Sequence, residues 1–195
     1  MNWLLLTILF PVTLHCGYER WAVKTGQDAG SRLKPVVATT IAALAHLRSP
    51  LPKQTGKYPP QINRRLTHED EPVTITGTIT AYRVENDSDI HLVVSNGKES
   101  LIAEIPNPGC MDNLAGHKGM GPSPWIAQVT AVRAAFLLKT GYTPTPWSSA
   151  FGPQFVKADI PVTLTGVTFF DWPHAQHGAA RNAVEIHPVL EIAFP

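Results

Sequence analysis

Residues 85–94, with the sequence ENDSDIHLVV, place three carboxylates and a histidine directly before an apolar run or at its start. The acidic residues are Glu85, Asp87 and Asp89, and the histidine is His91. Carboxylates and neutral imidazoles are ligands that suit Zn²⁺ or Mn²⁺, and an ion bound in this way can activate water for hydrolysis. The segment therefore predicts a polar site beside a buried strand.

Strand parity predicts which of these side chains share a face. In the expected strand 89–95 the apolar side chains at even positions face the core, whereas Asp89 and His91 face the other way. Glu104 lies on the same non-core face of the next expected strand, 100–105. If the NGKE sequence between them forms a four-residue turn, His91 is directly opposite Glu104, whereas a tighter Asn-Gly turn sets Asp89 opposite Glu104. Both registers keep the polar side chains together.

The last expected strand, 183–194, separates polar from apolar side chains in the same way, with Glu185 and His187 on its polar side. We expect this strand to meet the central hairpin at one face, as a hypothesis. The preceding loop contributes Asp171, His174 and His177. The candidate catalytic residues are Glu104, His91 and His187, and the candidate metal ligands, for a divalent ion as cofactor, are Asp87, Asp89, His91 and His187.

Three interpretations of this set stay open. The first is a divalent-metal site that activates water. The second is metal-free acid–base chemistry by Glu104 or His91, with a nearby arginine that stabilises an anion. The third is a set of solvated charges on the outer face of a sheet, in which the pair His91–Glu104 contributes roughly a few tenths of a kcal/mol.

The order of the expected elements is three strands, a helix and two strands, which is the plan of the OB-fold, a five-stranded Greek-key barrel. A generic antiparallel sandwich is the alternative. A further short amphipathic helix is expected near the N-terminus. The expected strands cover 73–81, 89–95, 100–105, 160–170 and 183–194, and the expected helices cover 36–48 and 123–139.

The chain has 195 residues and a formal charge of +1, so it fits one ordinary domain and carries no strong signal for nucleic acid or anionic membranes. The apolar run within residues 1–17 predicts a signal peptide, and hence a secreted or periplasmic protein, although a buried N-terminal element fits the same run. We expect an N-terminal extension over 18–70 and the barrel domain over 71–195. The leading expectation is an exported module that binds a small ligand or an oligomer, and the alternative is a metal-assisted hydrolase.

Two cysteines leave several states open. Cys16 follows the apolar run, where a lipoprotein cysteine would lie, but His15 before it does not favour a lipid anchor. Cys16 could instead form a bridge to Cys110 in an oxidising compartment, or be removed, which would leave Cys110 as a buried thiol or a nucleophile. Residues 19–28 are expected to be a mobile terminus, or a lid that folds back. Trp125, Trp147 and Trp172 are expected to be packing anchors rather than stacking platforms.

The sequence resembles a group of bacterial exported proteins of unknown function. The stretches that carry the resemblance are ERWAVKTGQD, ENDSDIHLVV, AEIPNPGC and GVTFFDWPHAQHGAARNAVEIHPVLEI. In that group an acidic-Asp-x-His strand, a Glu-x-Pro strand end and a Glu-x-His-Pro-Val ending recur. The resemblance covers nearly all of the chain after the apolar run and implies no activity.

A weaker resemblance is to the staphylococcal-nuclease branch of OB-folds, in which an Asp-rich strand precedes a strand with an acidic residue before a proline. It implies a metal-side role for Asp87 and Asp89 and a base-side role for Glu104. That branch also uses arginines to hold the phosphate, and none lies in the second or third expected strand. Arg83 and Arg133 are the nearest candidates in the sequence.

Overall fold

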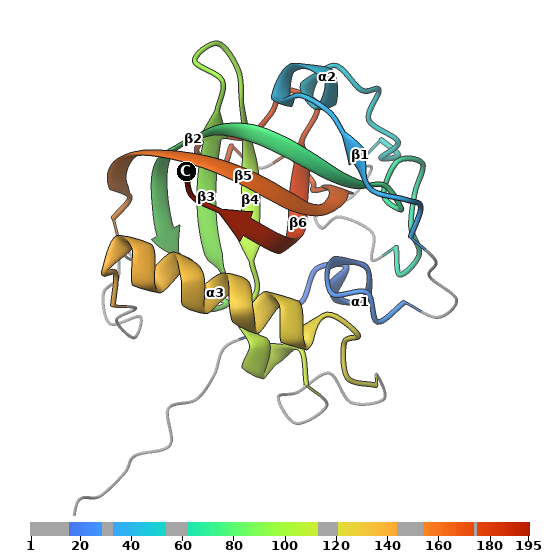
Figure 1. Cartoon of the computed structure of the whole chain (residues 1–195). Helices are drawn as coiled ribbons and strands as arrows, with labels where there is room; N and C mark the ends of the chain where they lie inside the picture. Colours follow the sequence, from blue (N-terminus) through green and yellow to red (C-terminus); the bar gives the residue numbers. More distant parts are fainter. Residues whose placement is uncertain (1–15, 29–32, 54–61, 113–120, 144–153, 174) are drawn as a thin grey trace, which may run out of the picture.

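The computed structural model describes residues 16–28, 33–53, 62–112, 121–143, 154–173 and 175–195. The described part is mainly β-structure with few helices (Figure 1). Its elements in chain order are α1 (Trp21–Lys24), β1 (Val37–Ala38), α2 (Ile41–Ala45), β2 (Pro72–Val84), β3 (Ile90–Ser95), β4 (Ser100–Ile105), the 3₁₀ turn η1 (Pro108–Cys110), α3 (Ile126–Thr140), β5 (Val156–Phe170) and β6 (Val184–Ala193).

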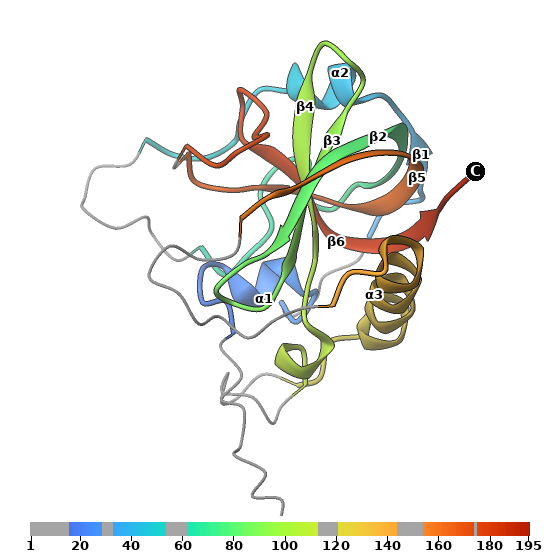
Figure 2. The same ribbon diagram turned by 90° about the vertical axis from the view of Figure 1, so that its left-hand side faces the viewer.

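The described strands form one sheet in the order β1-β2-β3-β4-β6-β5, and β2 also pairs with β5. This additional pairing joins β2, β3, β4, β6 and β5 into a ring of neighbours, and Figure 2 shows how strongly the long strands cross one another. Both strands of the β2–β5 pair are long, and their threonines face each other across it, as in the contact of 2.9 Å between the hydroxyls of Thr74 and Thr165. The expected order of three strands, a helix and two strands is therefore observed, with one short additional strand, β1, at the edge.

The register of the β3–β4 hairpin is the one that the four-residue turn predicts. Ser95 pairs with Ser100, and His91 is directly opposite Glu104. The turn is held by Asn96, whose side-chain oxygen accepts hydrogen bonds of 2.9 Å from the backbone N–H groups of Lys98 and Glu99. The register thus places the imidazole and the carboxylate side by side on one face.

The parallel pairing of β4 with β6 brings the last strand to the same place. Ile102 pairs with Glu185 and Ala103 with Ile186. Since side chains alternate along each strand, Glu104 and His187 lie on the face that also carries His91. The expected convergence of the hairpin and the last strand is therefore observed.

The opposite face of these strands forms the hydrophobic core. Leu92, Ala103 and Ile186 are fully buried there, together with Val129 and Phe136 of α3. The helix packs against β6 and lies across the lower end of the strands in Figure 1. It ends at Gly141, whose φ of 63° is the left-handed cap that favours glycine. The expected helix 123–139 is confirmed with a shift of a few residues.

The expected helix 36–48 is wrong for its first half. Val37 and Ala38 form β1, which pairs in parallel with Val73 and Thr74 of β2 and is exposed. The helix begins only after Thr40, whose hydroxyl accepts a hydrogen bond of 3.0 Å from the N–H of Ala43. This cap fixes the start of α2, and β-branched valines before it favour an extended chain.

The N-terminal segment 16–28 is part of the folded structure, so the expectation of a mobile terminus is wrong. Trp21 and Val23 of α1 are buried. Arg20 is fully buried, and its guanidinium contacts both oxygens of Glu69 at 2.6 Å and donates to the carbonyl of Phe170 at 3.0 Å. The segment is therefore fixed against the sheet at both the 62–71 region and the end of β5.

A disulfide between Cys16 and Cys110 fixes the start of the same segment, with a Cα–Cα distance of 5.4 Å. This finding selects the bridge among the cysteine states left open above and excludes Cys110 as a free nucleophile. Cys16 falls inside the expected signal peptide 1–17, of which residues 1–15 lie outside the described residues. Within the described residues, no helix has the length and apolarity needed to cross a membrane.

Candidate functional site

The polar face of β3, β4 and β6 is buried rather than solvated. Asp89 exposes 1% of its surface, His91 0%, Glu104 4% and His187 1%. Glu185 on β6 is equally buried, at 2%. The interpretation of this set as solvated charges on an outer face is therefore wrong, although its position on the non-core face is as expected.

The N-terminal segment covers part of this face. A Cβ at Gly17 would lie 3.2 Å from a carboxylate oxygen of Asp87, so the start of the segment runs directly beside the acidic loop. Further along, Arg20 and Lys24 stand over the ring of Phe169, at 4.7 and 5.1 Å from its centre. That ring in turn lies 5.8 Å from the imidazole of His187.

The loop before β6 covers the other side. A Cβ at Gly178 would come within 2.5 Å of the side chain of Val93, so the loop backbone is packed onto β3. Nε2 of His91 lies 3.0 Å from the carbonyl oxygen of His177. The ring of Phe155 packs edge-on against the imidazoles of His91 and His177. The two covers leave the polar face enclosed.

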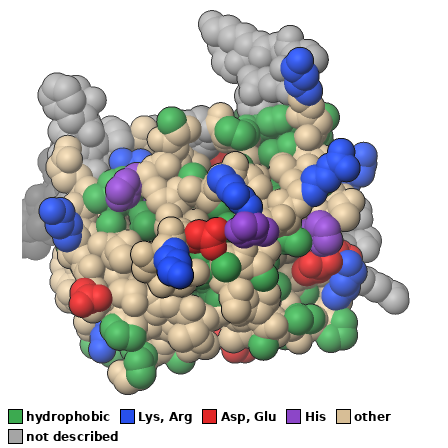
Figure 3. Space-filling view, turned by 90° about the horizontal axis from the view of Figure 1, so that it is seen from above, with side chains coloured by type: hydrophobic (Ala, Val, Ile, Leu, Met, Phe, Trp, Pro, Cys, Tyr) green, Lys and Arg blue, Asp and Glu red, His purple; other side chains and the backbone are tan. Residues whose placement is uncertain are grey.

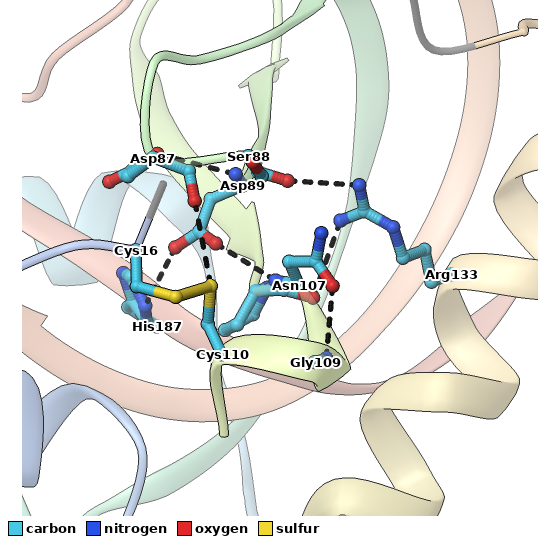
Figure 4. Close-up of a disulfide and its surroundings, with 10 residues drawn as sticks. Cys16, Asp87, Ser88, Asp89, Asn107, Gly109, Cys110, Arg133 and His187 are labelled. Carbon is cyan, nitrogen blue, oxygen red and sulfur yellow. Dashed lines mark hydrogen bonds and ion pairs between the residues drawn. A yellow bond between two sulfur atoms is a disulfide. The ribbon is translucent and has the colours of Figure 1, made fainter. Parts of the chain in front are cut away.

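Inside this enclosure Asp89, Glu104 and His187 form one triad, which we call the inner triad. Nδ1 of His187 is 2.9 Å from Oε2 of Glu104, and Nε2 of the same ring is 3.9 Å from Oδ2 of Asp89. Oδ1 of Asp89 accepts a hydrogen bond of 2.8 Å from the N–H of Asn107, which orients the carboxylate. Figure 4 shows Asp89 between His187 and Asn107, directly beside the disulfide.

Glu85, His91 and Glu104 form a second group, the outer triad. Nδ1 of His91 is 3.0 Å from Oε1 of Glu85 and 3.7 Å from Oε1 of Glu104. The side chain of Glu85 is 20% exposed, so this triad lies nearer to solvent than the inner one. In each triad one ligand atom per residue lies within 4.8 Å of the others, a spacing compatible with a metal ion after small adjustments.

Several buried polar atoms of the two triads have no aligned hydrogen-bond partner among the described residues. They are Oδ2 of Asp89, Nδ1 of His91, and Nδ1 and Nε2 of His187. Oε2 of Glu185 is in the same situation. A buried polar group without a partner costs about 1–3 kcal/mol, so such a group calls for an explanation. A bound cation is one.

Burial and mutual repulsion set the protonation of the acidic groups. Burial, followed by the charges of Asp87 and Glu104, raises the pKa of Asp89 well above its usual value. Burial and the charges of Asp171 and Glu104 raise the pKa of Glu185 in the same way. Such shifts report an excess of negative charge in a poorly solvated place.

Glu104 and His91 behave in the opposite way. Burial alone would raise the pKa of Glu104, but His187, Lys24 and His91 outweigh it and lower that pKa to about 2. Burial would lower the pKa of His91, but Glu85 and Glu104 outweigh it and raise that pKa. Glu104 is therefore the carboxylate that the two imidazoles and Lys24 stabilise in its charged form.

Lys24 supplies a positive charge to the acidic residues of the cluster. Burial opposes its charge, but attraction by Asp171, Glu104 and Glu185 outweighs burial and raises the pKa of Lys24. The lysine therefore stays charged.

The structure brings together Asp89, His91, Glu104 and His187, as the sequence predicts. Asp87 belongs to neither triad, and one of its oxygens accepts a hydrogen bond of 3.2 Å from the N–H of Asp89. Glu85 was not among the predicted ligands. It directly follows β2, and the register pairs His91 with Arg83, two residues before it, so only the contact of 3.0 Å in the folded structure shows that Glu85 reaches His91.

The remaining predicted residues lie outside the two triads. Arg133 donates to the carbonyls of Ser88 and Ile105 at 2.9 and 3.1 Å, so it tethers α3 to the acidic loop. Arg83 donates to Glu85 at 2.8 Å. Trp125 and Trp172 are buried, as expected of packing anchors. His174 and Trp147 lie outside the described residues.

No protein-family model matches the chain, and no curated protein matches it. A solved structure described as an aspartyl-tRNA synthetase from Leishmania major Friedlin is similar at 12% identity and a TM-score of 0.39, over 85% of this chain and 22% of that one. The chain thus spans about a fifth of that protein, at a similarity too low to support a functional argument.

Proposed function

We propose that this protein is an exported OB-like module that binds a divalent cation through the buried cluster of Asp89, His91, Glu104 and His187. Zn²⁺ and Mn²⁺ are the ions that a mixed set of carboxylates and imidazoles suits. The enclosure argues for an ion that organises this part of the protein.

One observation carries the proposal. The contacts of 2.9 Å between His187 and Glu104 and of 3.0 Å between His91 and Glu85 are short, yet Nδ1 of each histidine has no aligned hydrogen bond to any described residue. Two ligand atoms at about 2.1 Å from one ion are about 3.0–3.4 Å apart. The observed distances are close to those of neighbouring ligands around a cation, and the missing alignment distinguishes these contacts from ordinary hydrogen bonds.

Two other features support the finer parts of the proposal. The ring β2-β3-β4-β6-β5, with α3 between β4 and β5, has the order of an OB-fold, so we propose that the sheet is an OB-like barrel. Disulfides persist in oxidising compartments, so the Cys16–Cys110 bridge supports export. If a signal peptide is removed while the bridge is kept, cleavage falls before Cys16, and the signal is shorter than residues 1–17.

The experiment measures ion binding to chelator-treated protein. Equilibrium dialysis against Zn²⁺ or Mn²⁺ gives the uptake of the ion, and thermal melts with and without the ion give its effect on stability. The wild type is expected to take up the ion and to melt at a higher temperature with it. Glu104→Gln removes the central charge at constant size, and we expect affinity to fall by more than the about 10–100-fold that loss of an outer-shell partner costs.

The matched control is Glu99→Gln, on the surface hairpin, which we expect to bind as the wild type does. Dialysis well below the melting temperature separates lost binding from lost folding. A chelator-treated wild type that takes up neither ion would overturn the proposal.

A metal-assisted hydrolase, such as a phosphodiesterase or a nuclease, is the second candidate. It is favoured by Arg83, whose side chain is 30% exposed and lies beside Glu85 at the more open triad, where a guanidinium would meet a phosphate bound to the ion. Ion-dependent cleavage of an activated phosphodiester by the wild type, lost in Glu104→Gln, would support it.

A further inference from the structure

We infer that the cluster is a two-ion centre in which Glu104 bridges an inner and an outer cation. The inner ion is held by Asp89, Glu104 and His187, and the outer ion by Glu85, His91 and Glu104. This inference rests on the proposed cation binding and adds its stoichiometry, its bridging ligand and a distinct role for each ion.

The two oxygens of Glu104 face different histidines. Oε2 lies 2.9 Å from Nδ1 of His187, whereas Oε1 lies 3.7 Å from Nδ1 of His91. The sheet imposes this arrangement, because β4 lies between β3 and β6 and pairs with both. A carboxylate that points one oxygen at each of two separate imidazole–carboxylate pairs has the geometry of a bridging ligand.

The surroundings of His91 argue for an ion in the outer triad. Its Nε2 lies 3.0 Å from the carbonyl oxygen of His177, and a carbonyl only accepts, so Nε2 carries the proton and donates. In the neutral ring the lone pair is then on Nδ1, which faces oxygens of Glu85 and Glu104 without an aligned hydrogen bond. A lone pair facing two carboxylates is repulsive. In the ion-free protein a proton on Nδ1 relieves this repulsion, and a cation between the three groups takes the place of that proton. Donation of the second ring N–H to a backbone carbonyl is also the usual support of a metal-bound histidine.

The inner triad makes the same argument from different atoms. Oδ2 of Asp89 and both ring nitrogens of His187 have no aligned partner in the described part of the chain, and both residues are 1% exposed. A neutral imidazole gives one nitrogen to an ion, and its other nitrogen carries the ring proton. The other oxygen of Asp89 is already fixed by the N–H of Asn107 at 2.8 Å. One oxygen of this carboxylate is therefore oriented by the backbone, and the other is left for a ligand.

The charges also favour two ions over one. Glu85, Asp87, Asp89, Glu104, Asp171 and Glu185 place six carboxylates in and beside the triads, and Lys24 and Arg83 contribute two positive charges. Two divalent ions would balance the remaining four negative charges. A single ion in the outer triad would leave Asp89 without a divalent counterion in a poorly solvated place.

The two ions should differ in the rate at which they exchange with ions in solution. The inner ligands are enclosed beneath the N-terminal segment and beside the disulfide, so the inner ion should exchange slowly and act as a structural ion. The outer triad includes Glu85, whose side chain is 20% exposed, and so leaves room for water in the coordination of the outer ion. That ion should exchange quickly and offer a position to a small oxyanion such as phosphate.

The test is the number of ions bound per chain, measured by equilibrium dialysis of the full chain with Mn²⁺ at saturating concentration. The wild type is expected to bind two. Asp89→Asn and Glu85→Gln are each expected to bind one, and Glu71→Gln, which alters a histidine–carboxylate pair at the surface, is expected to bind two. The electron paramagnetic resonance spectrum of the wild type should show an exchange-coupled Mn²⁺ pair, a signature that needs no variant to fold.

The outcomes separate the two proposals. A wild type that binds a single uncoupled ion, lost in both Asp89→Asn and Glu85→Gln, would overturn the two-ion inference while the proposed function stands. A wild type that binds no ion would overturn both.

Discussion

Histidine–carboxylate pairs occur in two regions of this protein, and the two kinds differ in geometry rather than in distance. At the surface, His46 lies 2.9 Å from Glu99 and His68 lies 3.1 Å from Glu71, and both pairs are aligned hydrogen bonds. In the enclosed cluster, His91–Glu85 and His187–Glu104 have distances of 3.0 and 2.9 Å, but within the described parts of the chain Nδ1 of neither histidine has an aligned hydrogen bond.

The difference follows from what fixes each side chain. The imidazole of His46 is 57% exposed, so it is free to rotate until its hydrogen bond is straight. His187 and Glu104 are held by strand register and by dense packing, and no such rotation is available. A buried histidine–carboxylate pair without an aligned hydrogen bond lowers the stability of the fold. An ion bound by both side chains compensates this loss. The comparison therefore separates pairs that only neutralise charge from pairs arranged around a site.

The face of the molecule seen in Figure 3 illustrates the first kind of region. Acidic, basic and histidine side chains are interspersed there, without a large area of one charge. Such charges are screened by water and by their neighbours, and each contributes little. The enclosed cluster lacks that screening.

Removing the disulfide should have the largest effect on stability, because the disulfide ties down the segment 16–28 that covers the enclosed cluster. The double variant Cys16→Ala and Cys110→Ala releases a loop closed over 94 residues, for which chain entropy gives a loss of about 4.7 kcal/mol in unfolding free energy. Urea denaturation of the variant and of the wild type measures this loss. Addition of a reductant should lower the stability of the wild type by a similar amount and leave the variant unchanged. A loss below about 1 kcal/mol would show that the bridge does not hold the cover in place.

A change of pH should act on the enclosed region in a definite direction. The raised pKa values of Asp89 and Glu185 mean that the ion-free folded protein keeps protons that the unfolded chain releases near pH 4, so stability falls as pH rises above that value. The raised pKa of His91 acts in the same direction, because its contribution is present below about pH 6.5 and is lost as pH passes its folded value. Each such group costs up to about 1.4 kcal/mol per pH unit.

The measurement is urea denaturation in a chelator at pH 5, 6.5 and 8. The unfolding free energy of the ion-free protein should fall across this series. Glu104 and Glu85 do not oppose the trend in this range, since their lowered pKa values confine their titration to acid. The gain in melting temperature on adding Mn²⁺ should grow with pH, because the ion replaces the retained protons. A gain that is constant or shrinks with pH would contradict the argument.

The surface pairs should give the smallest effect. A double-mutant cycle of His46→Ala and Glu99→Gln is expected to yield a coupling of at most about 0.5 kcal/mol, reduced further by salt. The same cycle on His187 and Glu104, measured with Mn²⁺ in the buffer, should give a coupling several times larger and insensitive to salt. Equal couplings in the two cycles would remove the distinction between the regions.

The expected elements came from local patterns, and most of them are observed. Alternation of side chains and the NGKE turn placed His91 opposite Glu104, and the same signals located the strands and α3. The exception is the expected helix 36–48, where valines with suitable apolar spacing form an edge strand instead. A spacing of apolar residues does not distinguish a helix from an extended chain when the segment is short and its cap lies in the middle.

The candidate site was predicted in part. Asp89, His91, Glu104 and His187 were selected by parity alone, and they do converge. Glu85 was missed and Asp87 was included, because the reach of each carboxylate depends on the loop between β2 and β3 and not on its spacing in the sequence.

The sequence by itself determined which side chains share the polar face, since alternation along a strand is a local property of the backbone. Only the tertiary structure decided that this face is buried. Two segments enclose it. Segment 16–28 is about 60–170 residues away along the chain from the strands it covers and is fixed by Arg20 and the disulfide, and the loop at His177 is 86 residues away from His91, which it contacts. Burial of that kind is a sum of long-range contacts, and no local pattern of residues encodes it.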